Sequence, residues 1–423
     1  MILRKLKMIN KICRGTINFT SPMMINFLGN LAISRKAGNG LILDFQNQFA
    51  DYINIDHAIA VSCAKTALSL ALQALGAKAD DQIIVPSYTV TEVIDVIIAQ
   101  GLKPVFIDIS LCDGNMIPEL IEQEITKSTK FILMTHMHGN PCDIDSIIML
   151  ADKHGIAVIE DAAQACGAEY KDKKIGCFGK IAYFSFNMFK NINTLGGSML
   201  VTNDLKLADE IKKISSHFKP ISKIELMKRF FKAMILASVT KPPIFPLLVY
   251  PVLKLMGVQK HKSIDKKLKV KLLSRSKLKK IDRLFSPAQA GLGLLQLKKL
   301  DKLNQDKINN ALVLNEKLST VKDIVICKSQ TGIKCIYLNY VIMVKNRQGL
   351  IDFLFDKGID ISPGFVQACA YIREFEPFAA DCPNSLALEQ GNLYLPIYHP
   401  LNSKHMIKIA ALIGKYYEPK TRT

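Results

Sequence analysis

Amphipathic helical stretches alternate with short apolar runs from about residue 56 to residue 215. The run TALSLALQALG places Leu68, Leu72 and Leu75 on one helical face, and the run QIIVP that follows has the character of a buried strand. The same pairing recurs in TEVIDVIIAQG, KPVFIDIS, IPELIEQEI, KFILMTH, DIDSIIMLADKHG and IAVIED. Such alternation predicts right-handed crossovers and a mainly parallel sheet covered by helices on both faces. Ligands of α/β sheets bind at the carboxyl ends of the strands.

The length of 423 residues exceeds what one hydrophobic core usually fills, so we expect more than one domain. Regular patterns return after a break, first in the long amphipathic run PAQAGLGLLQLKKLDKLNQDKINNALVLNEKL and then in IYLNYVIMVK and RQGLIDFLFDKG. We predict four parts: an N-terminal arm at 1–40, a large α/β domain at 41–215, an insert at 216–285 and a smaller α+β domain at 286–423.

The insert carries most of the net charge of +19. Between Lys219 and Arg283 there are eighteen Lys or Arg and three Asp or Glu, a balance of 18 − 3 = +15. Its apolar part is interrupted by Lys241, Lys254 and four prolines, so it lacks the roughly 18–20 apolar residues that a membrane span needs.

Three interpretations of this insert compete. A solvated lysine-rich surface is one, and a nucleic-acid patch is the second, although no recognition motif accompanies the lysines and the apolar prolines have no role there. The third is peripheral contact with an anionic membrane, in which apolar residues enter the headgroup region and the basic residues attract lipid. We hypothesise the membrane contact and predict no nucleic-acid partner.

The ten cysteines show neither a CxxC pair nor a regular spacing. This argues against a zinc site and against a disulfide framework, and it favours a reducing compartment. The basic start MILRKLKMINKICRG is followed by an apolar run that two asparagines interrupt, without a cleavage site, so we expect no signal peptide. We predict a cytoplasmic protein, with any membrane association at the inner surface.

Lys190 lies in the run FSFNMFKNINTLGG, between an aromatic strand end and a pair of glycines. A lysine whose pKa is lowered can form a Schiff base with a carbonyl. Ser185 could offer its hydroxyl to a phosphate, and Gly196 and Gly197 let the backbone turn closely around a bound group. The local pattern alone also fits an exposed loop lysine.

Asp161 follows the buried run IAVIE, at the strand end where ligands bind in such sheets. In an enzyme that uses pyridoxal 5'-phosphate (PLP), a carboxylate there keeps the pyridine nitrogen protonated, so that the ring draws electrons from the substrate. The alternative is an aspartate that caps the helix beginning at AAQACGA.

His136 and His138 end another strand at the same edge, in the run THMHG. Their i and i+2 spacing places them on one face of a strand, which is compatible with a pair of metal ligands. No third ligand with fitting spacing appears, so we predict no metal and a structural or cofactor-packing role for His136.

The chain resembles the DegT/DnrJ/EryC1/StrS family of PLP-dependent sugar aminotransferases in a series of motifs that keep the family's order and spacing. The resemblance covers nearly everything except the N-terminal arm and residues 216–280. Its motifs are AVSCAKTALSLALQALG, IIVPSYTV, KPVFIDIS, THMHGNPCDIDSI, HGIAVIEDAAQACGAEYKDKKIGCFGKIAYFSFNMFKNINTLGGSMLVTND, SPAQAGLGLLQLKKLD and NLYLPIYHPLNSKHMIKIAALI.

The resemblance implies roles for individual residues. Lys190 takes the place of the family's Schiff-base lysine, and Asp161 that of the carboxylate at the pyridine nitrogen. Gln164 stands where a residue lies against the cofactor ring near its phenolic oxygen, and Ser185 where a phosphate ligand stands. The implied fold is PLP-dependent transferase fold type I, and the implied assembly is a homodimer with its sites at the subunit interface.

Several positions depart from the family pattern. Ala64 and Lys65 replace the Gly and Thr of the phosphate-holding turn, so that a backbone angle open only to glycine would be lost. Val90 stands where an aromatic residue commonly stacks on the pyridine ring, and Tyr88 points elsewhere if this stretch is a strand. Asp282 stands where an Asn reaches into the neighbouring subunit's site, and a carboxylate would repel the phosphate there. The usual Tyr-Pro-x-Pro-Leu-His element is missing after KGIDISPGF.

The resemblance implies an aminotransferase that passes an amino group from glutamate or glutamine to a keto group of a nucleotide-linked sugar, for surface polysaccharide or glycolipid synthesis. The departures leave two alternatives open. One is a catalytically degenerate relative with a binding or regulatory role. The other is an aminotransferase that acts on a lipid-linked sugar at the membrane surface.

Overall fold

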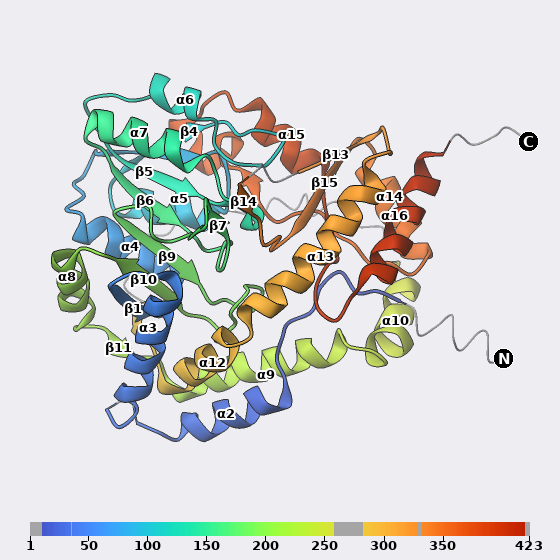
Figure 1. Cartoon of the computed structure of the whole chain (residues 1–423), viewed down its shortest axis with the longest axis horizontal. Coiled ribbons are helices and arrows are strands. Elements are labelled where there is room, and N and C mark those ends of the chain that lie inside the picture. Colours follow the sequence, from blue (N-terminus) through green and yellow to red (C-terminus); the bar gives the residue numbers. More distant parts are fainter. Residues whose placement is uncertain (1–10, 35, 258–281, 328–331, 419–423) are drawn as a thin grey trace, which may run out of the picture.

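A computed structural model describes residues 11–34, 36–257, 282–327 and 332–418 (Figure 1). Its largest element is a nine-stranded sheet with the strand order β11-β12-β1-β10-β9-β6-β5-β2-β4. In chain order, its strands are β1 (His57–Val61), β2 (Gln82–Pro86), β4 (Lys103–Ile107), β5 (Thr129–Thr135), β6 (Ala157–Asp161), β9 (Ile181–Ser185), β10 (Ser198–Thr202), β11 (Lys219–Pro220) and β12 (Arg283–Leu284).

Strands β4, β2, β5, β6 and β9 pair in parallel, as the alternation of helices and strands predicts. Beyond them β10 pairs antiparallel with β9 and with β1, so the sheet as a whole is mixed. The reason lies in the connection from β9 to β10, where residues 186–197 form a loop and no crossover helix. The fold is that of the α/β transferases of fold type I, as expected.

Helices cover both faces of this sheet. One face is packed by α4 (Ala64–Ala74), α5 (Thr91–Ala99) and α8 (Leu205–Ser215), through an apolar core that contains Leu68 and Ile94. The opposite face is packed by α3 (Asn39–Ile53), α6 (Pro118–Gln123) and α7 (Ile144–His154), through Phe49 and Ile147. These side chains are fully buried, and each contributes about 1.5–3 kcal/mol of transfer free energy.

A second apolar core lies in the C-terminal part of the chain. It surrounds an antiparallel sheet of β13 (Ile324–Ile326), β15 (Tyr340–Val344) and β17 (Asn392–Leu395), covered by α13 (Leu300–Leu318), α14 (Arg347–Asp356) and α16 (Ser403–Tyr417). Ile12 of the N-terminal arm is buried in the same core, and its backbone N–H donates to Gly358. The arm is therefore packed against the C-terminal part.

The long amphipathic run after residue 286 forms two helices, where the sequence suggested one. Helix α12 (Pro287–Leu297) ends two residues before α13 begins, and its start is fixed by a capping box between Ser286 and Gln289. Helix α12 packs against α2 (Ser21–Leu31) and against α3, so closely that a Cβ on Gly293 would lie 2.4 Å from the ring of Phe45. Because α13 packs against α16 instead, one straight helix could not make both contacts.

Most of the described part of the insert is helical, and the short strands β11 and β12 near its two ends join the large sheet. Helix α9 (Lys223–Val239) is followed by a turn of π-helix, η2 (Phe245–Val249), and by α10 (Tyr250–Leu255). The most basic stretch of the insert, 258–281, lies outside the described residues. Within the described part of the chain, every helix is too short or too polar to cross a bilayer.

The remaining elements are short. They are β3 (Tyr88–Thr89) paired with β16 (Gln367–Ala368), a small sheet of β7 (Glu169–Tyr170), β8 (Lys173–Lys174) and β14 (Ile333–Lys334), the 3-10 turns η1 (Met137–Gly139), η3 (Cys369–Tyr371) and η4 (Arg373–Phe378), and the helix α15 (Pro383–Gly391).

Candidate active site

Lys190 lies in the loop between β9 and β10 and lines a cavity of about 1500 Å³. The loop turns back on itself at this point, because the backbone N–H of Lys190 donates to the carbonyl of Asn187. Asp161, Gln164 and Ser185 line the same cavity. The structure therefore brings together the lysine, the carboxylate and both of the further residues that the sequence singled out.

Three polar side chains from α12 and α13 hold the Lys190 loop in place. The Gln296 amide accepts from the backbone N–H of Asn193 at 2.9 Å and donates to the carbonyl of the same residue. Gln289 donates to the carbonyl of Gly196 at 2.7 Å. Asn304 accepts from the Asn191 side chain at 2.6 Å, directly after the lysine. All three side chains are buried, so the loop is fixed by satisfied hydrogen bonds in a dry setting.

Sequence reasoning does not single out these three residues. The run SPAQAGLGLLQLKKLD contains two of them and was used only as a family motif. Buried glutamines on an otherwise apolar helix are a usable signal, because a buried amide requires hydrogen-bond partners.

Gly196 and Gly197 are needed for the shape of this loop. Their φ angles are 102° and 127°, which residues with a side chain rarely adopt. A Cβ on Gly196 would lie 2.3 Å from the Arg229 guanidinium, and one on Gly197 would lie 2.5 Å from the ring of Phe285. The predicted close turn after Lys190 is thus confirmed.

Asp161 ends the parallel strand β6, at the carboxyl edge of the sheet. Its carboxylate is 6 % exposed and accepts a hydrogen bond from the backbone N–H of Ala163 at 3.0 Å. Burial raises the pKa of Asp161, and the neighbouring Tyr183 hydroxyl, the Ala163 N–H and the Lys190 ammonium oppose this shift. No α-helix starts at the following residues, so the alternative of a helix cap is wrong.

The amine of Lys190 is set up to lose its proton near neutral pH. Burial lowers the pKa of Lys190 from 10.5 to about 8, and the charge of Asp161 opposes that shift. A fraction of the amine is therefore neutral at pH 7, which a nucleophilic lysine requires.

The turn before α4 is built differently from what the sequence suggested. Ala64 and Lys65 are the first residues of α4 and both line the cavity. Neither has a positive φ, so the loss of glycine at position 64 causes no strain. Cys63 occupies the capping position, and its thiol contacts the Thr66 hydroxyl at 3.5 Å but caps no backbone N–H of the helix. The first amides of α4 are therefore available to an anion.

Val90 lines the cavity, whereas Tyr88 does not. Tyr88 is fully buried, and its hydroxyl accepts a hydrogen bond from Asn392 at 3.0 Å. The prediction that Tyr88 points elsewhere is therefore confirmed. Asp282 does not line the cavity either; it accepts a hydrogen bond from the Thr66 hydroxyl at 3.0 Å, beside the same helix start.

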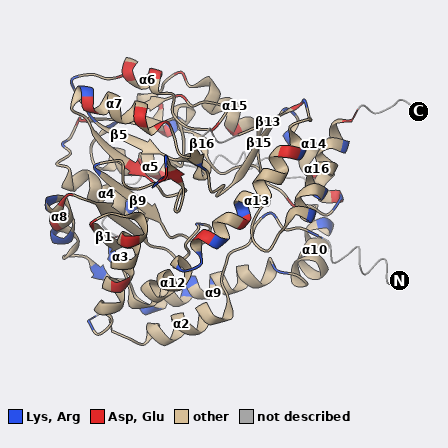
Figure 2. Ribbon diagram, viewed as in Figure 1, with Lys and Arg blue, Asp and Glu red and all other residues tan. Residues whose placement is uncertain are grey.

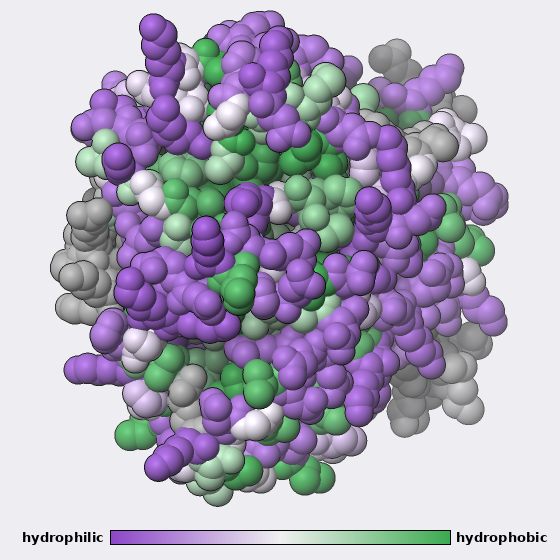
Figure 3. All heavy atoms as spheres, turned by 60° about the vertical axis from the view of Figure 1, so that its left-hand side comes forward, coloured by the Kyte–Doolittle hydropathy of each residue, from purple (hydrophilic) through white to green (hydrophobic). Residues whose placement is uncertain are grey.

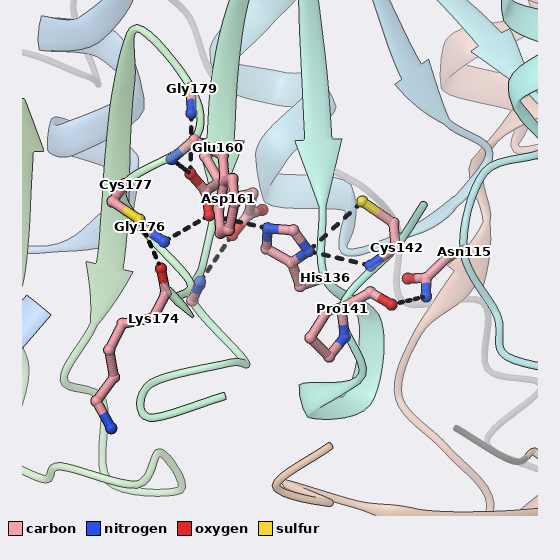
Figure 4. Close-up of polar contacts among 12 residues, drawn as sticks. Asn115, His136, Pro141, Cys142, Glu160, Asp161, Lys174, Gly176, Cys177 and Gly179 are labelled. Carbon is pink, nitrogen blue, oxygen red and sulfur yellow. Dashed lines mark hydrogen bonds and ion pairs between the residues drawn. The ribbon is translucent and has the colours of Figure 1, made fainter. Parts of the chain in front are cut away.

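Behind Asp161, a second carboxylate fixes the end of β6 (Figure 4). Glu160 accepts hydrogen bonds from the backbone N–H groups of Gly176, Phe178 and Gly179 and contacts His136 Nε2 at 3.1 Å. The other ring nitrogen of His136 accepts from the backbone N–H of Cys142, so the proton on Nε2 is donated to Glu160. Sequence reasoning did not single out Glu160, although it precedes Asp161 directly.

His136 and His138 do not share one face. Strand β5 ends at Thr135, and the chain turns through η1, in which His138 has a φ of 58°. His138 lies edge-on between Tyr88 and Tyr394, with centroid distances of 5.8 and 5.4 Å, and burial lowers its pKa to about 3. Within the described ranges, no three His, Cys, Asp or Glu side chains come together in a way that could hold a metal ion.

The cavity is rich in positive charge. Its lining holds nine basic side chains and three acidic ones: Lys11, Arg14, Lys65, Lys190, Arg229, Lys232, Lys241, Arg283 and Lys307 against Glu92, Asp161 and Glu225. Lys307 projects from α13, and its ammonium pairs with no carboxylate in the part of the chain that the structure describes. Burial lowers its pKa to about 8. An anionic ligand would relieve this uncompensated charge.

A mixed α/β sheet of this topology, with a partly buried lysine and a buried aspartate facing one cavity, defines the class of protein. The protein is a PLP-dependent transferase of fold type I. The model of the DegT/DnrJ/EryC1/StrS aminotransferase family matches residues 36–235 and 252–413. The chain belongs to this aminotransferase family.

The chain is also similar to individual proteins. An uncharacterized protein of Methanocaldococcus jannaschii is 29% identical over 382 residues, which cover 88% of this chain and 89% of that protein. A GDP-perosamine synthase of Escherichia coli O157:H7 is 42% identical over 178 residues, which cover 42% of this chain and 48% of the synthase. The crystal structure of an aminotransferase from Psychrobacter cryohalolentis superimposes with a TM-score of 0.76 at 24% identity, covering 95% of this chain and 98% of that one.

Proposed function

We propose that this enzyme transfers an amino group from glutamate or glutamine to a keto group of a nucleotide-linked sugar, for surface polysaccharide or glycolipid synthesis. One observation carries the proposal: Lys190, with a pKa lowered to about 8, faces the same cavity as the buried Asp161. The partial match to a GDP-perosamine synthase supports a nucleotide-linked sugar as the acceptor.

The residues of the cavity fit PLP. Lys190 would bind the cofactor aldehyde, and Asp161 would hold the proton on the pyridine nitrogen. Ser185 and the first amides of α4, beside Ala64 and Lys65, would hold the phosphate. Gln164 and Val90 would lie against the ring, with Val90 providing apolar contact in place of aromatic stacking.

Asp282 is the remaining proposed cofactor contact. Its hydrogen bond to Thr66 places it beside the turn that would hold the phosphate of its own subunit. We propose a homodimer, with Asp282 near the subunit interface where the family places an Asn.

When bound, PLP supplies an electron-withdrawing ring that stabilises negative charge on a substrate carbon. Asp161 maintains this property because its carboxylate is buried and is oriented by the Ala163 N–H. The Lys190 amine, once neutral, would take a proton from the substrate carbon and return it at the end of the transfer. Gln289, Gln296 and Asn304 would keep this amine in position through their hydrogen bonds to its loop.

The cavity also fits the substrates. A volume of about 1500 Å³ leaves room for a nucleotide-linked sugar beside the cofactor, and the basic lining would attract its diphosphate and the carboxylates of the amino donor. The ten cysteines are all free, which supports a location in the reducing cytoplasm.

Absorbance and borohydride trapping test the proposal. Purified protein given PLP is expected to show an absorption band near the visible edge, and trapping should label the peptide that contains Lys190. The Lys190→Ala variant should lose both. Protein that takes up no PLP would instead support the catalytically degenerate alternative. A panel of nucleotide-linked keto-sugars and one lipid-linked sugar, followed by mass spectrometry, would identify the acceptor.

A further inference from the structure

Helices α9 and α10 are apolar on two sides. The inner side of α9 is buried against α2, where Phe230 stacks on Phe27 with a centroid distance of 5.1 Å. A second stripe, at the helical spacing of Ile224, Phe231 and Ile235, faces away from that contact and is exposed. We call the outward apolar residues the α9–α10 surface: Ile224, Phe231, Ile235, Ile244, Leu247, Leu248, Val252, Leu255 and Met256.

The large apolar side chains of this surface are unusually exposed to solvent. Leu255 is 87% exposed and Ile224 71%, although burial of each such side chain would be favourable by about 1.5–3 kcal/mol. In Figure 1, α9 crosses the lower part of the molecule above α2, and α10 lies at the right-hand side. Hydrophobic residues also reach the surface at the lower end of the face in Figure 3. Exposed large apolar side chains gathered on neighbouring helices are typical of an interaction site.

The charges in the segment that carries the surface are mostly positive, although Asp356 pairs with Lys254 at 3.3 Å. From Leu226 to Gly257 the sequence contains no Asp, Glu or His and five Lys or Arg: Lys228, Arg229, Lys232, Lys241 and Lys254. Helix α2 contains no charged residue at all, and the lower edge in Figure 2 is mostly tan and blue. Glu225 precedes this stretch and pairs with Arg229.

Part of the surface lies where the family model has a gap. Ile244, Leu247 and Leu248 fall between its two matched ranges, and the other six residues fall within them. The family model stops at residue 235 and resumes at residue 252, so the end of α9 and η2 have no counterpart in it. The same segment adjoins the active site, because Thr240, Lys241 and Phe245 line the cavity that contains Lys190.

From these observations we propose that the α9–α10 surface binds an anionic phospholipid bilayer. Lysines spaced between exposed aliphatic and aromatic side chains suit a headgroup region, where the apolar groups enter and the ammonium groups meet phosphate. A second copy of the chain fits less well, because a two-fold contact would bring Lys228, Lys232 and Lys241 of both copies together. Asp356 and Glu225 already pair with Lys254 and Arg229.

Co-sedimentation with vesicles tests the proposal. The full-length holoenzyme should pellet with vesicles of phosphatidylcholine and phosphatidylglycerol. Its binding to vesicles of phosphatidylcholine alone should be weaker by about tenfold or more. The triple variant Ile235→Asp, Leu248→Asp, Leu255→Asp should lose about tenfold or more of this binding. Its matched control, Met149→Asp, Leu205→Asp, Leu312→Asp, changes equally exposed residues elsewhere and should bind as the wild type does.

A charge variant keeps the test decisive if the triple variant fails to fold. Lys228→Glu with Lys232→Glu should weaken binding to anionic vesicles by about tenfold, whereas Lys127→Glu with Lys130→Glu makes the same change in net charge and should weaken it far less. Wild-type protein that stays in the supernatant would overturn the proposal, as would equal loss in the surface and control variants. Loss of a dimer in the surface variant, without vesicle binding by the wild type, would assign the surface to a second copy.

Discussion

At the scale of single residues, the candidate site depends on one partly buried amine that lines the cavity. Burial disfavours the charged form of Lys190, as it does for Lys307. Lys190 differs from Lys307 in having Asp161 nearby, which partly restores the charged form. The nearby His138 is held neutral by the same burial. The site therefore provides one amine that loses its proton near neutral pH and, beside it, one buried carboxylate whose pKa is raised by burial.

We predict that PLP uptake by the apoenzyme depends on the pKa of Lys190. A neutral amine is needed for covalent attachment, so the rate of uptake should rise roughly tenfold per pH unit from pH 6 to pH 7.5 and level off above pH 8. Stopped-flow absorbance measures this rate. The reaction of PLP with a lysine in solution, whose pKa is ordinary, corrects for titration of the cofactor itself. A rate that keeps rising to pH 10 would contradict the prediction.

At the scale of elements, α12 and α13 determine whether the Lys190 loop is held. A loop that contains two glycines with positive φ gains little order from its own sequence. The buried amides of Gln289, Gln296 and Asn304 supply that order from another part of the chain. The break between the two helices lets both reach the loop.

Gln296→Ala should therefore lower the free energy of unfolding by about 1–3 kcal/mol, because the Asn193 N–H and carbonyl lose their partner in a buried site. PLP should also dissociate faster from this variant. Urea denaturation and the decay of cofactor absorbance measure the two effects. Gln305→Ala is the matched control, since Gln305 is exposed on α13 and bonds to Asn309; a loss as large there would argue against the role of the buried contact.

At the scale of the whole molecule, the N-terminal arm joins distant parts of the chain. Arg14 lines the active-site cavity and makes a two-point contact with the buried carboxylate of Asp360, at 2.7 and 2.9 Å. The arm also carries α2, on which α9 and α12 pack. The cavity is thus completed by residues from both ends of the sequence.

Replacing Arg14 by Met should lower the free energy of unfolding by about 2–3 kcal/mol, because Asp360 would remain buried without its cation. Chemical denaturation measures this loss. Lys103→Met removes an exposed pair with Asp80 and should change stability by less than about 0.5 kcal/mol. Similar values for the two variants would show that the arm is not anchored by this contact.

Much of the fold and part of the site could be predicted from the sequence. The alternation of patterns determined the parallel core of the sheet, because local helix and strand preferences agree with the positions of apolar residues there. The family motifs selected Lys190, Asp161, Gln164 and Ser185, and the structure places all four at one cavity. Their catalytic roles remain to be tested.

Only the tertiary structure decided the rest. Three features depend on partners far away in the sequence. They are the separation of His136 from His138, the hydrogen bonds that hold the Lys190 loop, and the outward stripe of α9. Sequence periodicity reports which side chains are apolar, but it does not report which of two apolar helix faces finds a neighbour. That choice depends on long-range packing, and here packing left one apolar face of α9 exposed.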